Sequence, residues 1–193
     1  MRVVGFRNVR EDERAQAFAT LISAFTDDPV ERWLYPDAHQ YLTRFPEFLA
    51  ALGGKAFDEQ TVWSLADVGA VALWLPPGTE PDGDAIISVL TDSVSPEKHG
   101  DMFSVLQQMD VGHPTFPHWY LPWFGVDAAQ QEKEARRPVA EACLTVVDTS
   151  HLPDASAVAV DVTSKPLLLA EPAAGTVGVA TSNFVLIDAT IRT

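Results

Sequence analysis

The sequence predicts one α+β domain over residues 1–193, with a mixed, twisted central sheet flanked by helices. Segments in which apolar residues recur at helical spacing alternate along the chain with short segments of strand character. No internal repeat, low-complexity tract or long linker divides the chain. With 47% hydrophobic residues, a chain of this length can bury a full core without a disulfide or a structural metal.

The first elements are a strand and a helix. Apolar residues alternate over 3–9, which predicts the strand. Asp12 is a suitable N-cap, and the helix it begins is predicted to run to about Phe25 because its apolar residues follow the helical spacing. The run Asp27-Asp28-Pro29 ends this helix.

A second helical region carries Trp33, begins again after Pro36 and ends at the glycine pair Gly53-Gly54. Residues 61–65 and 70–75 read as a hairpin. The elements predicted after the hairpin are helices at 84–89 and 96–109, a strand at 118–126, a helix at 139–147, and strands at 158–162, 176–182 and 185–191.

Composition limits the partners. The formal net charge of −14, with 13 Lys and Arg, disfavours nucleic acids and anionic membranes, because both are polyanions. No apolar run reaches the roughly 20 residues of a spanning helix. The single Cys143 fits a reducing cytoplasm, where we expect the protein as a monomer or homodimer. No paired cysteines or His-x-x-x-His pair exist, so no metal site is predicted.

Four sequence blocks resemble a bacterial subgroup of the GNAT acyltransferase superfamily. They are residues 24–29 (AFTDDP), 32–37 (RWLYPD), 72–78 (ALWLPPG) and 118–126 (HWYLPWFGV). The resemblance implies a GNAT-like sheet of six to seven strands, with 118–126 as its central fourth strand. It also implies that the first three blocks form the opening on the substrate side.

The same resemblance places an acetyl-CoA diphosphate turn, Val-x-x-x-x-Gln-Gly-x-Gly-x-Gly, after this strand. Val126 and Gln131 match it, but the glycine positions hold Glu132, Glu134 and Arg136. Each carboxylate there repels a phosphate by roughly 4 kcal/mol at about 4 Å in an effective dielectric of about 20. The position of the family's thiolate-protonating tyrosine holds Ala170. We therefore expect no cofactor, and acetyl-CoA is disfavoured although possible.

The aromatic residues of the four blocks are the expected lining of a pocket for a small molecule. Those assigned to substrate binding are Trp33, Tyr35, Trp74, Trp119 and Trp123. For each of them the alternative is core packing. Asp28 is a further candidate that suits a substrate amine, although an aspartate before proline also fits a helix break.

His118 and Tyr120 are the candidate catalytic residues. Strand alternation places both on one face, with Trp119 on the other. Histidine titrates near neutrality and serves as a general acid or base, and the tyrosine beside it is a proton donor. The alternative for His118 is a structural histidine.

Three functions remain open at this point. The first is an enzyme that carries out an acid/base-catalysed step without acetyl-CoA, such as a cyclisation, isomerisation or elimination of a small metabolite. The second is a catalytically silent binding or scaffold protein with the same pocket. The third is an N-acetyltransferase that holds acetyl-CoA in an altered way.

Overall fold

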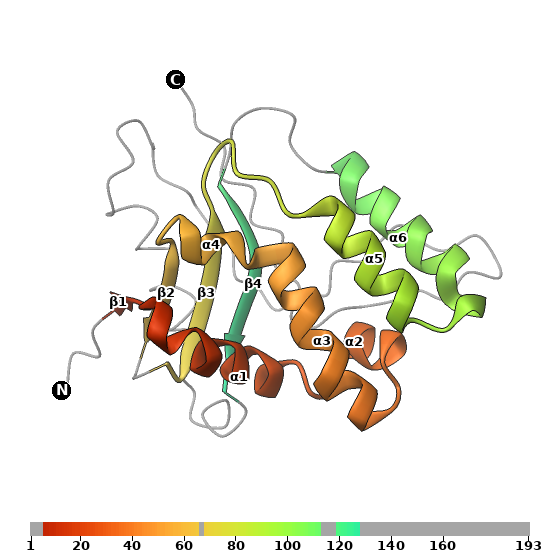
Figure 1. Ribbon diagram of the computed structural model, residues 1–193, viewed down its shortest axis with the longest axis horizontal. Coiled ribbons are helices and arrows are strands. Elements are labelled where there is room, and N and C mark those ends of the chain that lie inside the picture. The colour runs from red at the N-terminus through yellow and green to blue at the C-terminus, as the bar shows by residue number, and fades with distance from the viewer. Residues whose placement is uncertain (1–5, 66–67, 113–118, 128–193) are drawn as a thin grey trace.

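The computed structural model describes residues 6–65, 68–112 and 119–127, which form an antiparallel sheet with helices packed against one face (Figure 1). In chain order the elements are β1 (Phe6–Asn8), η1 (Glu11–Glu13), α1 (Arg14–Ala24), α2 (Pro29–Leu34), α3 (Ala38–Gly53), α4 (Lys55–Asp58), β2 (Val62–Leu65), β3 (Ala70–Leu75), α5 (Gly83–Ser93), η2 (Pro96–Lys98), α6 (His99–Gly112) and β4 (Tyr120–Val126). This arrangement confirms the α+β class. The elements predicted after residue 127 lie outside the described residues.

The described strands pair in chain order, β1-β2-β3-β4, and each neighbouring pair is antiparallel. Along β3 the side chains alternate between two faces. Val71, Leu73 and Leu75 join the core beneath the helices, whereas Ala72 and Trp74 point to the opposite face. Helices α1 and α3 lie across β3 and β4, and α5 packs on α3. The layer of helices therefore defines an inner face of the sheet.

Two glycines allow the helices to approach β4 closely. A Cβ atom on Gly53 of α3 would lie 2.7 Å from Cδ1 of Trp123 and 3.1 Å from Cδ2 of Leu73. A Cβ atom on Gly125 of β4 would lie 2.7 Å from Cβ of Ala24 in α1. The two distances of 2.7 Å are too short for carbon atoms, so each site requires glycine for contact rather than for backbone conformation.

Gly53→Ala is expected to lower the free energy of unfolding by about 1–3 kcal/mol, because the added methyl group forces the well-packed indole of Trp123 to shift. Urea unfolding followed by circular dichroism measures the change. Gly100→Ala in α6 is the matched control, since no atom lies within 4 Å of its added Cβ. Equal stability of the two variants would contradict the close approach of α3 to β4.

Pro122 interrupts the pairing between β3 and β4. Leu73 pairs with Trp123 and Leu75 with Tyr120, so β4 has one residue more than β3 over this stretch. Proline has no N–H for the ladder, and the extra residue is accommodated as a bulge. The sequence predicts that the sheet opens after Trp123. The interruption instead precedes Trp123, and pairing with β3 continues to Val126.

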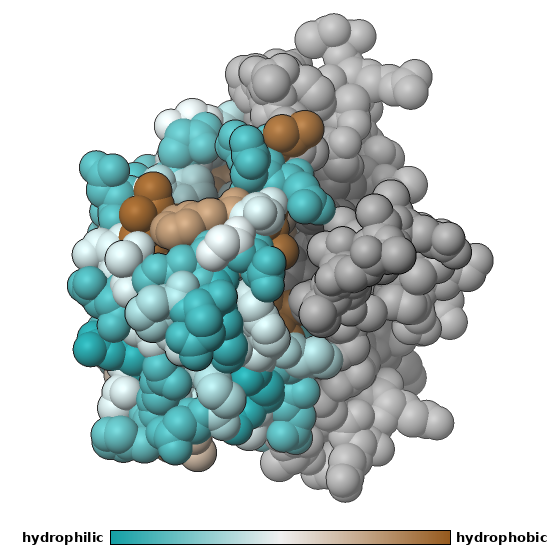
Figure 2. Space-filling view, turned by 90° about the vertical axis from the view of Figure 1, so that its right-hand side faces the viewer, coloured by the Kyte–Doolittle hydropathy of each residue, from teal (hydrophilic) through white to brown (hydrophobic). Residues whose placement is uncertain are grey.

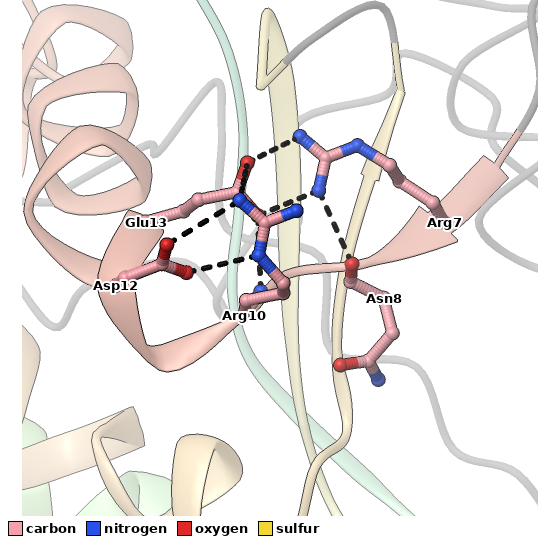
Figure 3. Close-up of polar contacts among 5 residues, drawn as sticks. All are labelled: Arg7, Asn8, Arg10, Asp12 and Glu13. Carbon is pink, nitrogen blue, oxygen red and sulfur yellow. Dashed lines mark hydrogen bonds and ion pairs between the residues drawn. The ribbon is translucent and has the colours of Figure 1, made fainter.

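A cluster of ion pairs joins β1 to η1 (Figure 3). Arg7 binds Glu13 through two hydrogen bonds, with N–O distances of 2.7 and 2.8 Å. The backbone N–H of Arg10 also donates to Glu13, at 3.1 Å, and its side chain pairs with Asp12. These contacts, led by the Arg7 hydrogen bonds, lower the pKa of Glu13 from 4.5 to about 2.

This lowered pKa gives a pH prediction. Because the folded pKa lies below the unfolded one, the contribution of Glu13 to stability is present above pH 4.5 and is lost as pH falls towards about 2. Glu13→Gln is therefore expected to lower the melting temperature at pH 6, with the difference vanishing near pH 2. Glu11→Gln, which removes a more exposed acid of η1, is the control. A pH-independent difference for Glu13→Gln would contradict the assignment.

Candidate functional site

The candidate pocket residues separate by burial. Asp28, Tyr35, Trp74 and Trp123 are at most 2% exposed. The half-buried candidates are Trp33, Trp119 and Tyr120. Within the described residues, the structure therefore gives three of the candidates surface that a ligand can reach without rearrangement.

Trp123 lies in the aromatic part of the core. Its ring is edge-on to the rings of Phe25, Phe45 and Phe48, with centroids 5.2, 5.5 and 5.6 Å apart. Such edge-to-face packing joins α1, α3 and β4. Trp123 is thus placed where it stabilises the fold, and a contact with substrate stays a prediction.

The aromatic candidates on β3 and β4 lie on both faces of the sheet. Tyr120 packs against the core on the inner face. Trp74 and Trp119 meet edge to face on the opposite side, with ring centroids 6.5 Å apart. The structure therefore brings these two tryptophans together but separates them from Tyr120. Burial raises the pKa of Tyr120 to about 12, so its phenol stays protonated at neutral pH.

A buried pair of carboxyl groups lies at α2. Asp28 is its N-cap, and one carboxylate oxygen accepts hydrogen bonds from the N–H groups of Val30, at 2.9 Å, and Glu31, at 3.4 Å. Glu31 is 1% exposed, and neither of its carboxyl oxygens has a hydrogen-bond partner among the described residues. A buried carboxyl group without a partner is costly, so this position calls for a physical explanation.

The geometry of the helix start explains why the N-cap does not pair with Glu31. Asp28 and Glu31 occupy the N-cap and N3 positions, where a glutamate commonly accepts a hydrogen bond from the N-cap N–H. Here the N–H of Asp28 donates to the carbonyl of Phe25 instead, at 3.0 Å. The Glu31 side chain is left in the interior. Burial first, and the charge of Asp28 second, raise its pKa well above 4.5.

Two tyrosines adjoin this acid pair. The hydroxyl groups of Tyr35 and Ser93, the last residue of α5, are 3.2 Å apart. Tyr41 of α3 donates to the carbonyl of Ile22 at 2.6 Å. Burial, reinforced by the negative charge of Glu31 when ionised, raises the pKa of Tyr35 to about 12 and that of Tyr41 further. The tyrosines therefore remain neutral at pH 7, and Glu31 keeps its proton to higher pH than a solvated carboxyl group does.

Trp33 has a cationic neighbour. The ammonium group of Lys98, in η2, lies 5.4 Å from the centre of the Trp33 ring and donates to the Trp33 carbonyl. The face of the molecule that includes α2, α5 and α6 is largely hydrophilic, with a group of hydrophobic atoms among them (Figure 2). Trp33 thus joins α2 to η2 through Lys98.

The remaining candidates lie outside the described residues: His118, Gln131, Glu132, Glu134 and Arg136. Among the described residues there is no group of three or more His, Cys, Asp or Glu side chains that would hold a metal ion. In this same part of the chain, no helix has the length and apolar character needed to cross a membrane.

Glu31 is the residue that the sequence did not reveal. Its signal was the Asp-x-x-Glu spacing at a helix start, which ordinarily marks an exposed cap. No protein-family model matches the chain, and no curated protein matches it significantly. The GNAT resemblance therefore rests on the four sequence blocks, and the function proposed for the site rests on the chemistry of its residues.

Proposed function

We propose that the protein is an enzyme with a GNAT-like fold that performs acid/base chemistry on a small metabolite without acetyl-CoA. The observation that carries the proposal is Glu31, a fully buried carboxyl group without a hydrogen-bond partner among the described residues, placed beside Asp28. A carboxyl group whose pKa is shifted by burial and by a like charge is a candidate for a functional site. The reaction class is a cyclisation, isomerisation or elimination.

The chemistry follows from the protonation states. A carboxyl group whose pKa is raised by burial keeps its proton to higher pH, so it can donate that proton to a developing anion and recover it later, which is worth about 10²–10⁴-fold in rate. Tyr120, whose pKa is about 12, serves as a second donor. His118 is the third proposed acid/base group, and Trp33 is a proposed substrate contact. His118→Ala is expected to lower turnover by about 10²-fold.

The proposed fold extends the four described strands to six or seven. The antiparallel order β1-β2-β3-β4 with α1 and α3 on one face is compatible with the first half of a GNAT-like sheet. The cofactor part of the proposal rests on Glu132, Glu134 and Arg136. We expect acetyl-CoA to bind with a Kd above about 1 mM, and isothermal titration measures it.

The test uses turnover. The protein is incubated with a metabolite extract without acetyl-CoA, and untargeted mass spectrometry follows every compound. One compound is expected to give a product of equal mass, or of a mass reduced by water or ammonia. Glu31→Gln should slow this by about 10²-fold or more, whereas Glu47→Gln, an exposed acid of α3, should not.

Three outcomes would overturn the proposal. A product that gains an acetyl group from added acetyl-CoA supports the acetyltransferase alternative. A compound that binds and is recovered unchanged supports the silent binding protein. Full turnover in Glu31→Gln removes this residue from the chemistry. The proposed setting is the cytoplasm, with the protein as a monomer or homodimer.

A further inference from the structure

The position of Glu31 raises the question of how a substrate reaches it. The side chain is 1% exposed, and it lies close enough to Tyr35 and Tyr41 for its charge to raise the pKa of both phenols. Proton transfer to a ligand requires hydrogen-bond distance. Either α2 or its neighbours must therefore move for Glu31 to act.

Helix α2 is suited to move as a unit. It has six residues, too few to be stable without tertiary contacts, and prolines stand at its first position and two residues after its end. Hydrogen bonds at both ends of α2 are made within residues 28–36. Asp28 accepts from the N–H groups of the first turn, and the Arg32 guanidinium donates to the carbonyl of Pro36 at 2.7 Å. These capping bonds can move with the segment. The backbone hydrogen bonds inside α2 nevertheless exchange once it opens, because a six-residue helix is not stable without its tertiary contacts.

Hydrogen bonds and a cation–π contact join α2 and its C-cap Tyr35 to α5 and η2. Lys98 places its ammonium group over the Trp33 ring and donates to the Trp33 carbonyl. Tyr35 and Ser93 share one hydrogen bond. These contacts are opposed by the cost of burying Glu31, which has no hydrogen-bond partner in the described part of the chain, and opening relieves that cost. Leu34 and Tyr35 in the core, and the Arg32 guanidinium 5.7 Å from the centre of the Tyr41 ring, also hold α2. Loss of the Lys98 contacts therefore shifts the balance towards opening without abolishing the closed state.

We infer that α2 is a lid that closes over Glu31 and that Lys98 is the residue that latches it. The catalytic use of this lid rests on the proposed function. The lid controls when Glu31 contacts the substrate and water. Opening exposes Glu31 and separates Trp33 from Lys98. Lys98 is thus a positioning residue, which acts through α2 rather than on the substrate.

The experiment measures opening directly and needs no substrate. Hydrogen exchange is followed at the amides of Arg32 and Tyr35, which donate within α2 to the carbonyls of Asp28 and Glu31. Lys98→Met should raise their exchange rate roughly tenfold, as expected from losing a cation–π contact and one hydrogen bond. Carbodiimide labelling mapped by mass spectrometry should rise at Glu31 in parallel.

Two variants provide the controls. Lys98→Arg keeps a cation for the ring and a donor for the carbonyl, so it should restore slow exchange. Lys55→Met removes another lysine that donates to a backbone carbonyl, that of Glu80 at 2.8 Å, and should leave α2 unchanged. The amide of Tyr41, which donates to Asp37 in α3, reports general destabilisation.

The lid is supported if exchange and labelling rise in α2 alone. It is overturned if Lys98→Met changes α2 no more than Lys55→Met does, or if Tyr41 exchanges faster by the same factor. The exchange experiment needs no turnover. It therefore supports or overturns the lid even if the proposed enzyme function fails.

Discussion

Trp123→Ala is expected to lower the free energy of unfolding by about 3–5 kcal/mol. The indole is 1% exposed and touches three phenylalanine rings, so its removal loses the burial of the largest kind of side chain and leaves a cavity. A loss of this size is a large part of the roughly 5–15 kcal/mol that stabilises a typical domain. Urea unfolding followed by circular dichroism measures it.

Trp63→Ala is the matched control, because it truncates the same side chain where β2 leaves it half-buried. Trp123→Phe should fall between the two, since it keeps one aromatic ring in the cluster. If Trp123→Ala costs no more than Trp63→Ala, the indole is not at the centre of the core. In that case its predicted role in substrate binding would gain weight.

The helices were predictable because their signals are local. Apolar spacing marked α1 and α3, and the aspartates that precede α2 and α3 are N-caps whose carboxylates accept backbone N–H groups. The short helix α4 was not predicted, since Gly53-Gly54 favours a stop. The chain continues as a helix there because Ala56 and Phe57 are buried, and α4 packs against β3. Tertiary packing therefore determines that α4 forms.

The bulge explains why the sequence could not predict which aromatic residues share a face of the sheet. Alternation correctly separates Trp119 from Tyr120, and in a regular strand it would place Trp123 with Trp119. The extra residue at Pro122 reverses the alternation, so Trp123 shares the inner face with Tyr120. One proline therefore changes which aromatic residues belong to the core and which lie beside Trp74.

The acid pair was beyond sequence reasoning for a different reason. Glu31 reads as an ordinary acidic residue in the first turn of a helix, a position that normally faces water. Its burial depends on tertiary packing, and residues distant in sequence, such as Ser93 and Lys98, contact this segment through Tyr35 and Trp33. Local patterns give the helix and its cap, but they do not report which side of a six-residue helix is covered.

Glu31→Gln is expected to make the protein more stable at neutral pH. The folded pKa of Glu31 lies well above the unfolded value of 4.5, so its neutral form contributes fully below pH 4.5. As pH rises from there towards the raised folded pKa, the unfolded state loses its proton while the folded state keeps it, and stability falls by about 1 kcal/mol per pH unit. Glutamine does not titrate, so the variant escapes this loss.

The measurement compares the free energy of unfolding of the protein and Glu31→Gln from pH 4 to 8. The two curves should diverge above pH 4.5 in favour of the variant, while Glu47→Gln should run parallel to the unmodified protein. Curves that stay parallel for Glu31→Gln would show that Glu31 is solvated or paired in solution. A stabilised variant that has also lost turnover would link the two results, because a residue retained at a cost to the fold is then one that the chemistry needs.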